Sequence, residues 1–237
     1  MDLKEYFKEA DMVLVGIGEV FQDKFEEIKV VDEKNPSIWE EYARKKYLDT
    51  CSSNEITEAY EKLEKVLEGK NYFIVTLCTD DKIYKTNIKP DRIVAPCGSY
   101  SLLQCEEVCT EDIYLLELYK DTLEKGLEPI CPKCGKRLVM NHIGVKKYSE
   151  EGYLDKWNLY IKWLQGSLNK KICILELGVG MKYPTVIRWP FEKVAFINQK
   201  AKFTRVHEQL YQLTEDIKEN GISIRENPVD FLRNQIV

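Results

Sequence analysis

The stretch Met12-Val-Leu-Val-Gly-Ile-Gly18 decides the fold class that this sequence predicts. An apolar, β-branched run that closes with Gly-x-Gly is typical of a buried parallel strand leading into a tight turn. Residues 171–180, Lys-Ile-Cys-Ile-Leu-Glu-Leu-Gly-Val-Gly, show the same pattern. Two such strands in one sheet would place both glycine turns at its carboxyl edge, where open α/β sheets bind ligands.

The remaining segments predict strands that alternate with helices. Further strands are expected at residues 72–77, 92–95 and 193–198. Helices are expected at residues 2–10, 19–48 with a break at 35–37, 55–67, 112–123, 153–168, 208–218 and 229–236. This alternation predicts an α/β fold, a Rossmann-like parallel sheet covered by helices on both faces.

Length and charge narrow the class of protein further. The chain has 237 residues, with 35 Lys and Arg against 40 Asp and Glu, a formal net charge of −5. The length predicts one domain over residues 1–237. The acidic balance argues against binding nucleic acid by bulk charge. Neither a membrane span nor a signal peptide is expected, so we expect a cytoplasmic protein without a membrane partner.

Eight cysteines and only two histidines favour a thiolate metal site. Cys105 and Cys109 form one pair, and Cys131 and Cys134 form a second pair after 21 intervening residues. Two such pairs can supply the four tetrahedral ligands of a structural zinc ion, with no position left open for catalysis. The alternative is that they are ordinary buried thiols. The prediction is a zinc module over residues 105–144, inserted in the single domain.

The glycine turns could form a cofactor site. We expect Gly16, Gly18, Gly178 and Gly180 to let a pyrophosphate approach the backbone, and Asn198, at the end of the last predicted strand, to offer its amide to a ribose or base. The alternative is a pair of plain strand-to-helix turns. Glu19, which follows the first turn, would repel a phosphate.

Taken together, these motifs resemble those of the sirtuins. The family has Gly-Ala-Gly-x-Ser, Thr-Gln-Asn-x-Asp and His-Gly motifs before the zinc pairs. The corresponding segments here are Gly16-Ile-Gly-Glu-Val20, Thr76-Leu-Cys-Thr-Asp80 and Cys97-Gly98. Residues 97–109, 175–180 and 187–192 are similar to the macrodomain-linked branch, whose members are protein ADP-ribosyltransferases. The resemblance implies an NAD and zinc cofactor set, ADP-ribose as a ligand, and a protein substrate, a lipoyl-carrier protein in that branch.

The catalytic positions depart from the family pattern. Cys78 stands where the family has Asn, Cys97 where it has His or Gln, and Ser99 where the branch has Asp. Asp80, which the resemblance places near the nicotinamide amide, is retained. The candidate catalytic residues are therefore Asp80, Cys97 and Cys78. Cys97 is either a reactive thiolate or a neutral residue in a repurposed site, and a redox pair with Cys78 is a further alternative.

Two functional hypotheses follow. The first is an NAD-binding, sirtuin-like transferase that moves ADP-ribose to a protein. Deacylation is not expected, because Cys97 leaves the ribose hydroxyl without an obvious proton acceptor. The second is a catalytically inactive sirtuin-fold module that binds a nucleotide or a partner. The sequence leaves open whether the protein is an enzyme.

Overall fold

A central parallel sheet organises the computed structural model, which describes residues 3–22, 36–50 and 53–234. Its strand order is β3-β2-β1-β7-β8-β9. The strands are β1 (Met12–Ile17), β2 (Tyr72–Thr76), β3 (Ile93–Val94), β7 (Ile172–Leu177), β8 (Lys202–Val206) and β9 (Gly221–Ile224). Every residue of β1 and β7 is buried. Their near-continuous apolar sequence fits strands covered on both faces.

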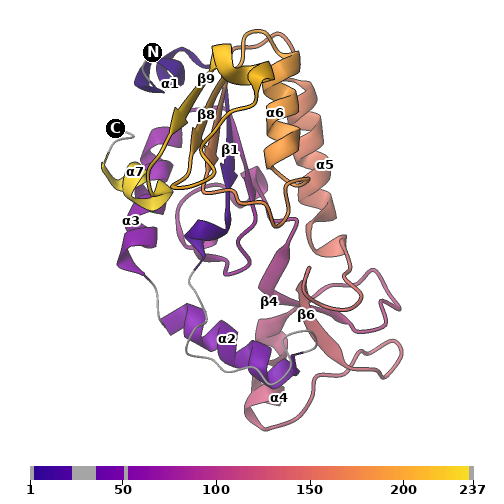
Figure 1. The fold of residues 1–237 in the computed structure, drawn as a ribbon. Coiled ribbons are helices and arrows are strands. Elements are labelled where there is room, and N and C mark those ends of the chain that lie inside the picture. The colour runs from indigo at the N-terminus through magenta and orange to yellow at the C-terminus, as the bar shows by residue number, and fades with distance from the viewer. Residues whose placement is uncertain (1–2, 23–35, 51–52, 235–237) are drawn as a thin grey trace.

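Helices cover the two faces of this sheet (Figure 1). Residues of α1 (Leu3–Glu9), α3 (Asn54–Leu67) and α7 (Pro228–Asn234) share one apolar core with Val13 and Val15 of β1. Residues of α5 (Glu151–Gln165) and α6 (Arg188–Ile197) share the other core with Leu14. The alternation of β1 side chains between the two cores confirms the predicted α/β architecture.

A smaller unit lies beyond the sheet and has its own core (Figure 1). It contains α2 (Ile38–Thr50), α4 (Lys120–Glu124) and an antiparallel sheet in the order β5-β4-β6. Its strands are β4 (Gly98–Cys105), β5 (Tyr114–Leu115) and β6 (Leu138–His142). Ser37 caps α2: its hydroxyl accepts from the Glu40 N–H, and Glu40 accepts from the Ser37 N–H. This capping box fixes the helix start after the predicted break.

Three predicted elements are wrong. Residues 193–197 lie in α6 and Asn198 caps its end, because Phe191 and Ala195 face the core at helical spacing; the strand comes later, as β8. Residues 208–218 form a loop and part of a 3₁₀ helix, Glu215–Asn220, before β9. Residues 112–123 contain β5, a 3₁₀ turn and most of α4. Of the helix expected from residue 19, the structure shows a 3₁₀ turn, Glu19–Phe21, and α2; residues 23–35 lie outside the described part.

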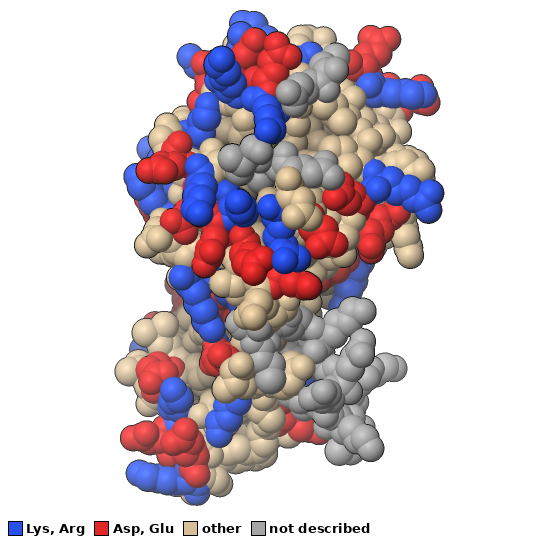
Figure 2. Space-filling model, turned by 90° about the vertical axis from the view of Figure 1, so that its left-hand side faces the viewer, with Lys and Arg blue, Asp and Glu red and all other residues tan. Residues whose placement is uncertain are grey.

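The surface carries mixed charge on the face drawn in Figure 2, where Lys and Arg lie among Asp and Glu. None of the helices in the described ranges is both long and apolar enough to cross a bilayer.

Candidate functional site

The two predicted glycine turns meet at the carboxyl edge of the sheet. A Cβ atom on Gly18 would collide with the backbone carbonyl of Gly178. Gly178 has φ +62°, a left-handed conformation that favours glycine, and a Cβ there would lie 2.9 Å from the Cβ atom of Val20. Gly16 packs against Phe191 of α6. Close packing within the chain therefore requires these glycines, independently of any ligand.

The second turn is already hydrogen-bonded to a carboxylate. The backbone N–H of Gly180 donates to Oε2 of Glu19 across 3.2 Å. A backbone N–H in such a turn is the type of donor that would meet a phosphate oxygen. Glu19 is thus an internal anion that competes for this donor.

A buried cluster of charges holds the second turn in place. Glu176 of β7 and Arg205 of β8 are register partners, 0% and 1% exposed, and Arg205 donates to both carboxylate oxygens of Glu176, at 2.6 and 2.9 Å. Arg205 also contacts Glu192 at 2.7 Å. Arg188 lies 3.5 Å from Glu176 and completes a cluster of two cations and two anions.

The same two arginines bind loop carbonyls at the sheet edge. Arg188 donates to Val179 O, inside the glycine turn, at 2.8 Å and to Leu210 O at 2.7 Å. Arg205 donates to Gln212 O at 2.7 Å. The cluster therefore fixes the 178–180 turn relative to the loop after β8. The sequence analysis missed it, although a glutamate inside an otherwise apolar strand, Glu176, was an available signal.

The two candidate cysteines are buried, neutral thiols. Burial, followed by the charge of Asp80, raises the pKa of Cys78 well above its ordinary value. Its sulfur lies 3.4 Å from the carbonyl oxygen of Gly18. Burial, followed by the charge of Glu19, raises the pKa of Cys97 to about 12. These environments favour the interpretation of Cys97 as a neutral residue, because the thiolate is the nucleophilic form.

The two polar candidate residues, Asp80 and Asn198, lie at opposite edges of the sheet. Asp80 follows β2, is 1% exposed, and its Oδ1 accepts from the Lys82 N–H at 3.2 Å. Asn198 ends α6 instead of a strand, and its amide donates to Ser167 O and Lys170 O, which precede β7. The prediction that Asn198 closes the last strand is therefore wrong, because the helix returns the chain to the amino-terminal edge.

A carboxylate that the sequence analysis missed lies beside Ser99. The Ser99 hydroxyl donates to Oδ2 of Asp81 at 2.6 Å. Burial raises the pKa of Asp81, although hydrogen bonds from Ser101 and Ser99 partly offset that effect. Asp81 has φ +61°, uncommon for a non-glycine residue. Asp81 thus brings an acid next to the position where the sequence has Ser instead of the branch's Asp.

The four clustered cysteines come together in the small unit. Their sulfur atoms all lie within 4.8 Å of one another, with Cys105–Cys134 at 3.5 Å and Cys109–Cys131 at 3.7 Å. Four thiolates on one zinc ion, each about 2.3 Å away, would be separated by about 3.8 Å. The residues therefore fit a tetrahedral ion.

Backbone donors around Cys131 also suit a metal thiolate. Burial raises the pKa of this thiol, but the N–H groups of Cys134 and Lys133 donate to its sulfur and help lower the pKa to about 7. The Cys-Pro-Lys-Cys turn that creates these donors is the one that the spacing indicated. Hydrogen bonds of this kind stabilise the deprotonated ligand that a metal requires.

A parallel α/β sheet covered by helices on both faces, joined to a small unit with a four-cysteine cluster, defines the class of fold, and solved structures of the same fold are known. The chain matches a structure on sirtuin substrate affinity with TM-score 0.64 and 17% identity, covering 98% of this chain and 97% of the other. A Sir2 complex with a p53 peptide and NAD+ matches with TM-score 0.63, 17% identity and coverage of 98% and 96%. The chain therefore has the sirtuin fold.

Two curated proteins are similar in sequence. A protein ADP-ribosyltransferase of Staphylococcus aureus is 24% identical over 268 residues, covering 95% of this chain and 83% of that protein. A probable bifunctional ADP-ribose hydrolase/ADP-ribosyltransferase of Fusarium oxysporum is 25% identical, covering 58% of this chain but only 26% of its own length. No protein-family model matches the sequence.

Proposed function

We propose that the protein binds NAD or ADP-ribose at the carboxyl edge of its sheet and, when active, transfers ADP-ribose to a protein. The observation that carries the proposal is the similarity to the Staphylococcus aureus ADP-ribosyltransferase over most of both chains. One structural neighbour is a complex with NAD+, which supports a dinucleotide as the ligand. The lipoyl-carrier expectation gains no support from these relatives.

Three residues of the chain would affect ligand binding in different ways. Arg188 donates a hydrogen bond to Val179 O in the 178–180 turn, so the turn has an internal contact that does not depend on a ligand. Asp80 lies at the same edge of the sheet. Its carboxylate, which matches the family's Asp, would lie near the nicotinamide end of the bound NAD. Glu19 opposes the pyrophosphate, so we expect weak affinity for NAD. Bound NAD would supply the ADP-ribosyl group itself.

Deacylation is not part of the proposal. Cys97 is a poor proton acceptor, because its high pKa keeps the thiol protonated at neutral pH. We expect no NAD-dependent turnover of an acetyl-lysine peptide.

We also propose that Cys105, Cys109, Cys131 and Cys134 hold one structural zinc ion. Four protein ligands leave no open coordination position, so the ion would stabilise the small unit and take no part in the reaction.

Calorimetric titration with NAD and with ADP-ribose tests the binding proposal, and release of free nicotinamide tests catalysis. Heat with either ligand and release of nicotinamide support the transferase. Heat without nicotinamide release would favour the second hypothesis, an inactive nucleotide-binding module. No heat with either ligand would overturn the proposed dinucleotide site.

A further inference from the structure

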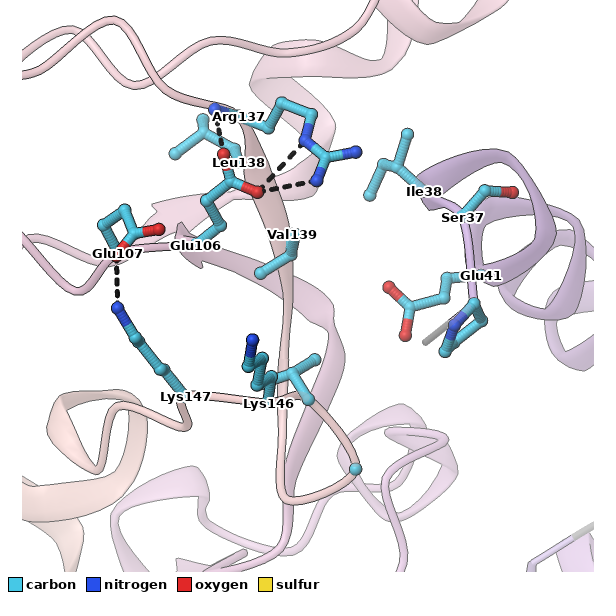
Figure 3. Close-up of a pocket in the computed structure, with 13 residues that line it drawn as sticks. Ser37, Ile38, Glu41, Glu106, Glu107, Arg137, Leu138, Val139, Lys146 and Lys147 are labelled. Atoms are coloured by element: carbon cyan, nitrogen blue, oxygen red, sulfur yellow. Dashed lines mark hydrogen bonds and ion pairs between the residues drawn. The ribbon is translucent and has the colours of Figure 1, made fainter. Parts of the chain in front are cut away.

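A cavity of about 480 Å³ lies between α2 and β6, in the small unit. Figure 3 shows it, with the amino end of α2 on one side and the strand and its following loop on the other. Its apolar lining residues are Pro36, Ile38, Leu138, Val139 and Val145. The cavity is independent of the glycine turns at the sheet edge, which do not line it.

One buried carboxylate faces this cavity. Glu41 is 1% exposed, and Figure 3 shows its carboxylate pointing from α2 into the space beside Val139. Oε1 lies 2.6 Å from Nε2 of His142. Among the residues that the structure describes, Oε2 has no hydrogen-bond donor.

The partner of Glu41 is a neutral imidazole. The Gly144 N–H donates to Nδ1 of His142 at 3.0 Å, so Nδ1 carries no proton. The single ring proton is therefore on Nε2, which donates it to Glu41. Glu41 is hydrogen-bonded to this ring and forms no ion pair with a Lys or Arg of the described residues, an unfavourable state for a buried carboxylate.

The three cationic side chains that line the cavity form no ion pair with Glu41. Arg137 binds Glu106 at 2.8 and 3.0 Å, and Lys147 pairs with Glu107. Lys146 is exposed and forms no ion pair with a carboxylate in the described ranges. An anionic ligand at the start of α2 is disfavoured, because the Glu40 carboxylate already caps the helix there.

We propose that this cavity binds a primary alkylammonium group, such as the unmodified lysine side chain of a partner protein. The ammonium would donate to Oε2 of Glu41, a charge-assisted hydrogen bond. The alkyl arm would lie along Ile38, Leu138 and Val139, as lysine arms commonly do on apolar surfaces. This inference does not rest on the proposed function.

The test is an NMR titration of the full chain with Nα-acetyl-lysine methylamide. The control ligand is the norleucine analogue, which keeps an alkyl arm and lacks the ammonium. We expect saturable shifts around β6 with the lysine compound, and affinity for the norleucine compound at least about tenfold weaker. Equal binding of the two ligands, or no saturable binding of the lysine compound, would overturn the proposal.

The variant Glu41→Gln provides a second test. Glutamine keeps a hydrogen-bond acceptor for His142 and removes the negative charge. We expect lysine-compound affinity to fall about tenfold or more. The matched control is Glu111→Gln, an exposed residue of the same unit outside the cavity, which should bind like wild type. Wild-type affinity in a folded Glu41→Gln protein would contradict the assignment of Glu41. The two-ligand comparison in wild type decides the matter if Glu41→Gln does not fold.

Discussion

The Glu19 carboxylate accepts a hydrogen bond from the Gly180 backbone N–H across 3.2 Å, and this contact joins the turns that follow β1 and β7. It gives the carboxyl edge of the sheet an anion of its own. Any phosphate that binds this turn must compete with Glu19 or displace it. If a dinucleotide binds at this edge as proposed, its affinity should depend on the Glu19 carboxylate.

Glu19→Ser should strengthen NAD binding about fivefold, because it removes a like charge worth on the order of 1 kcal/mol at this distance. Calorimetric titration of both proteins measures the change. Glu215→Ser, a surface variant with the same change in net charge, is the control and should bind like wild type. Weaker binding by Glu19→Ser would mean that Glu19 assists the ligand.

Purified protein should contain one zinc ion per chain, and Cys131→Ser should lose it and destabilise the small unit. The reason is that zinc binding is itself part of the folding free energy of such modules. Elemental analysis and thermal unfolding measure the two effects. Cys173→Ser, which changes a buried thiol in β7 outside the cluster, should keep its zinc. Zinc-free wild-type protein would contradict the metal assignment.

The free energy of unfolding should fall as the pH rises above about 9. The folded state raises the pKa of Cys97 from 9.0 to about 12, so between these values the folded chain keeps a proton that the unfolded chain releases. The stabilisation of the folded state by this raised pKa is complete below pH 9 and is lost as the pH rises toward 12. For one such thiol, the free energy of unfolding falls by up to about 1.4 kcal/mol per pH unit.

Urea unfolding at pH 7.5 and pH 10 measures this loss, which should be smaller in Cys97→Ala. Ser149→Ala changes a buried side chain that does not titrate in this range, so it should keep the wild-type pH dependence. The same pH dependence in Cys97→Ala and wild type would show that Cys97 is not responsible.

Arg205→Met should destabilise the protein by about 3–5 kcal/mol, because it leaves Glu176 buried without its main cation. Adding Glu176→Met removes the uncompensated charge, so the double variant should be more stable than Arg205→Met alone. Chemical denaturation of wild type, both single variants and the double variant gives the coupling energy. Additive effects would show that the pair is not coupled.

Part of this architecture could be read directly from local sequence. Apolar strands ending in glycine turns predicted β1 and β7, and the paired cysteine spacing predicted the four-sulfur cluster that the structure brings together. The local pattern at residues 193–198 predicted a strand, but the structure has the end of helix α6 there. An apolar segment of that length is compatible with either a strand or a helix until its packing partners are known.

The fold class and the four-cysteine cluster could be predicted from the chain alone, because hydrophobic periodicity and short ligand spacings act within a few residues along the chain. The surroundings of the polar groups, by contrast, depend on the tertiary structure. Glu19 meets Gly180, Glu176 meets Arg205, and Glu41 meets His142 across 161, 29 and 101 positions of sequence. Such contacts depend on the packing of whole elements against one another, which no short stretch of sequence specifies.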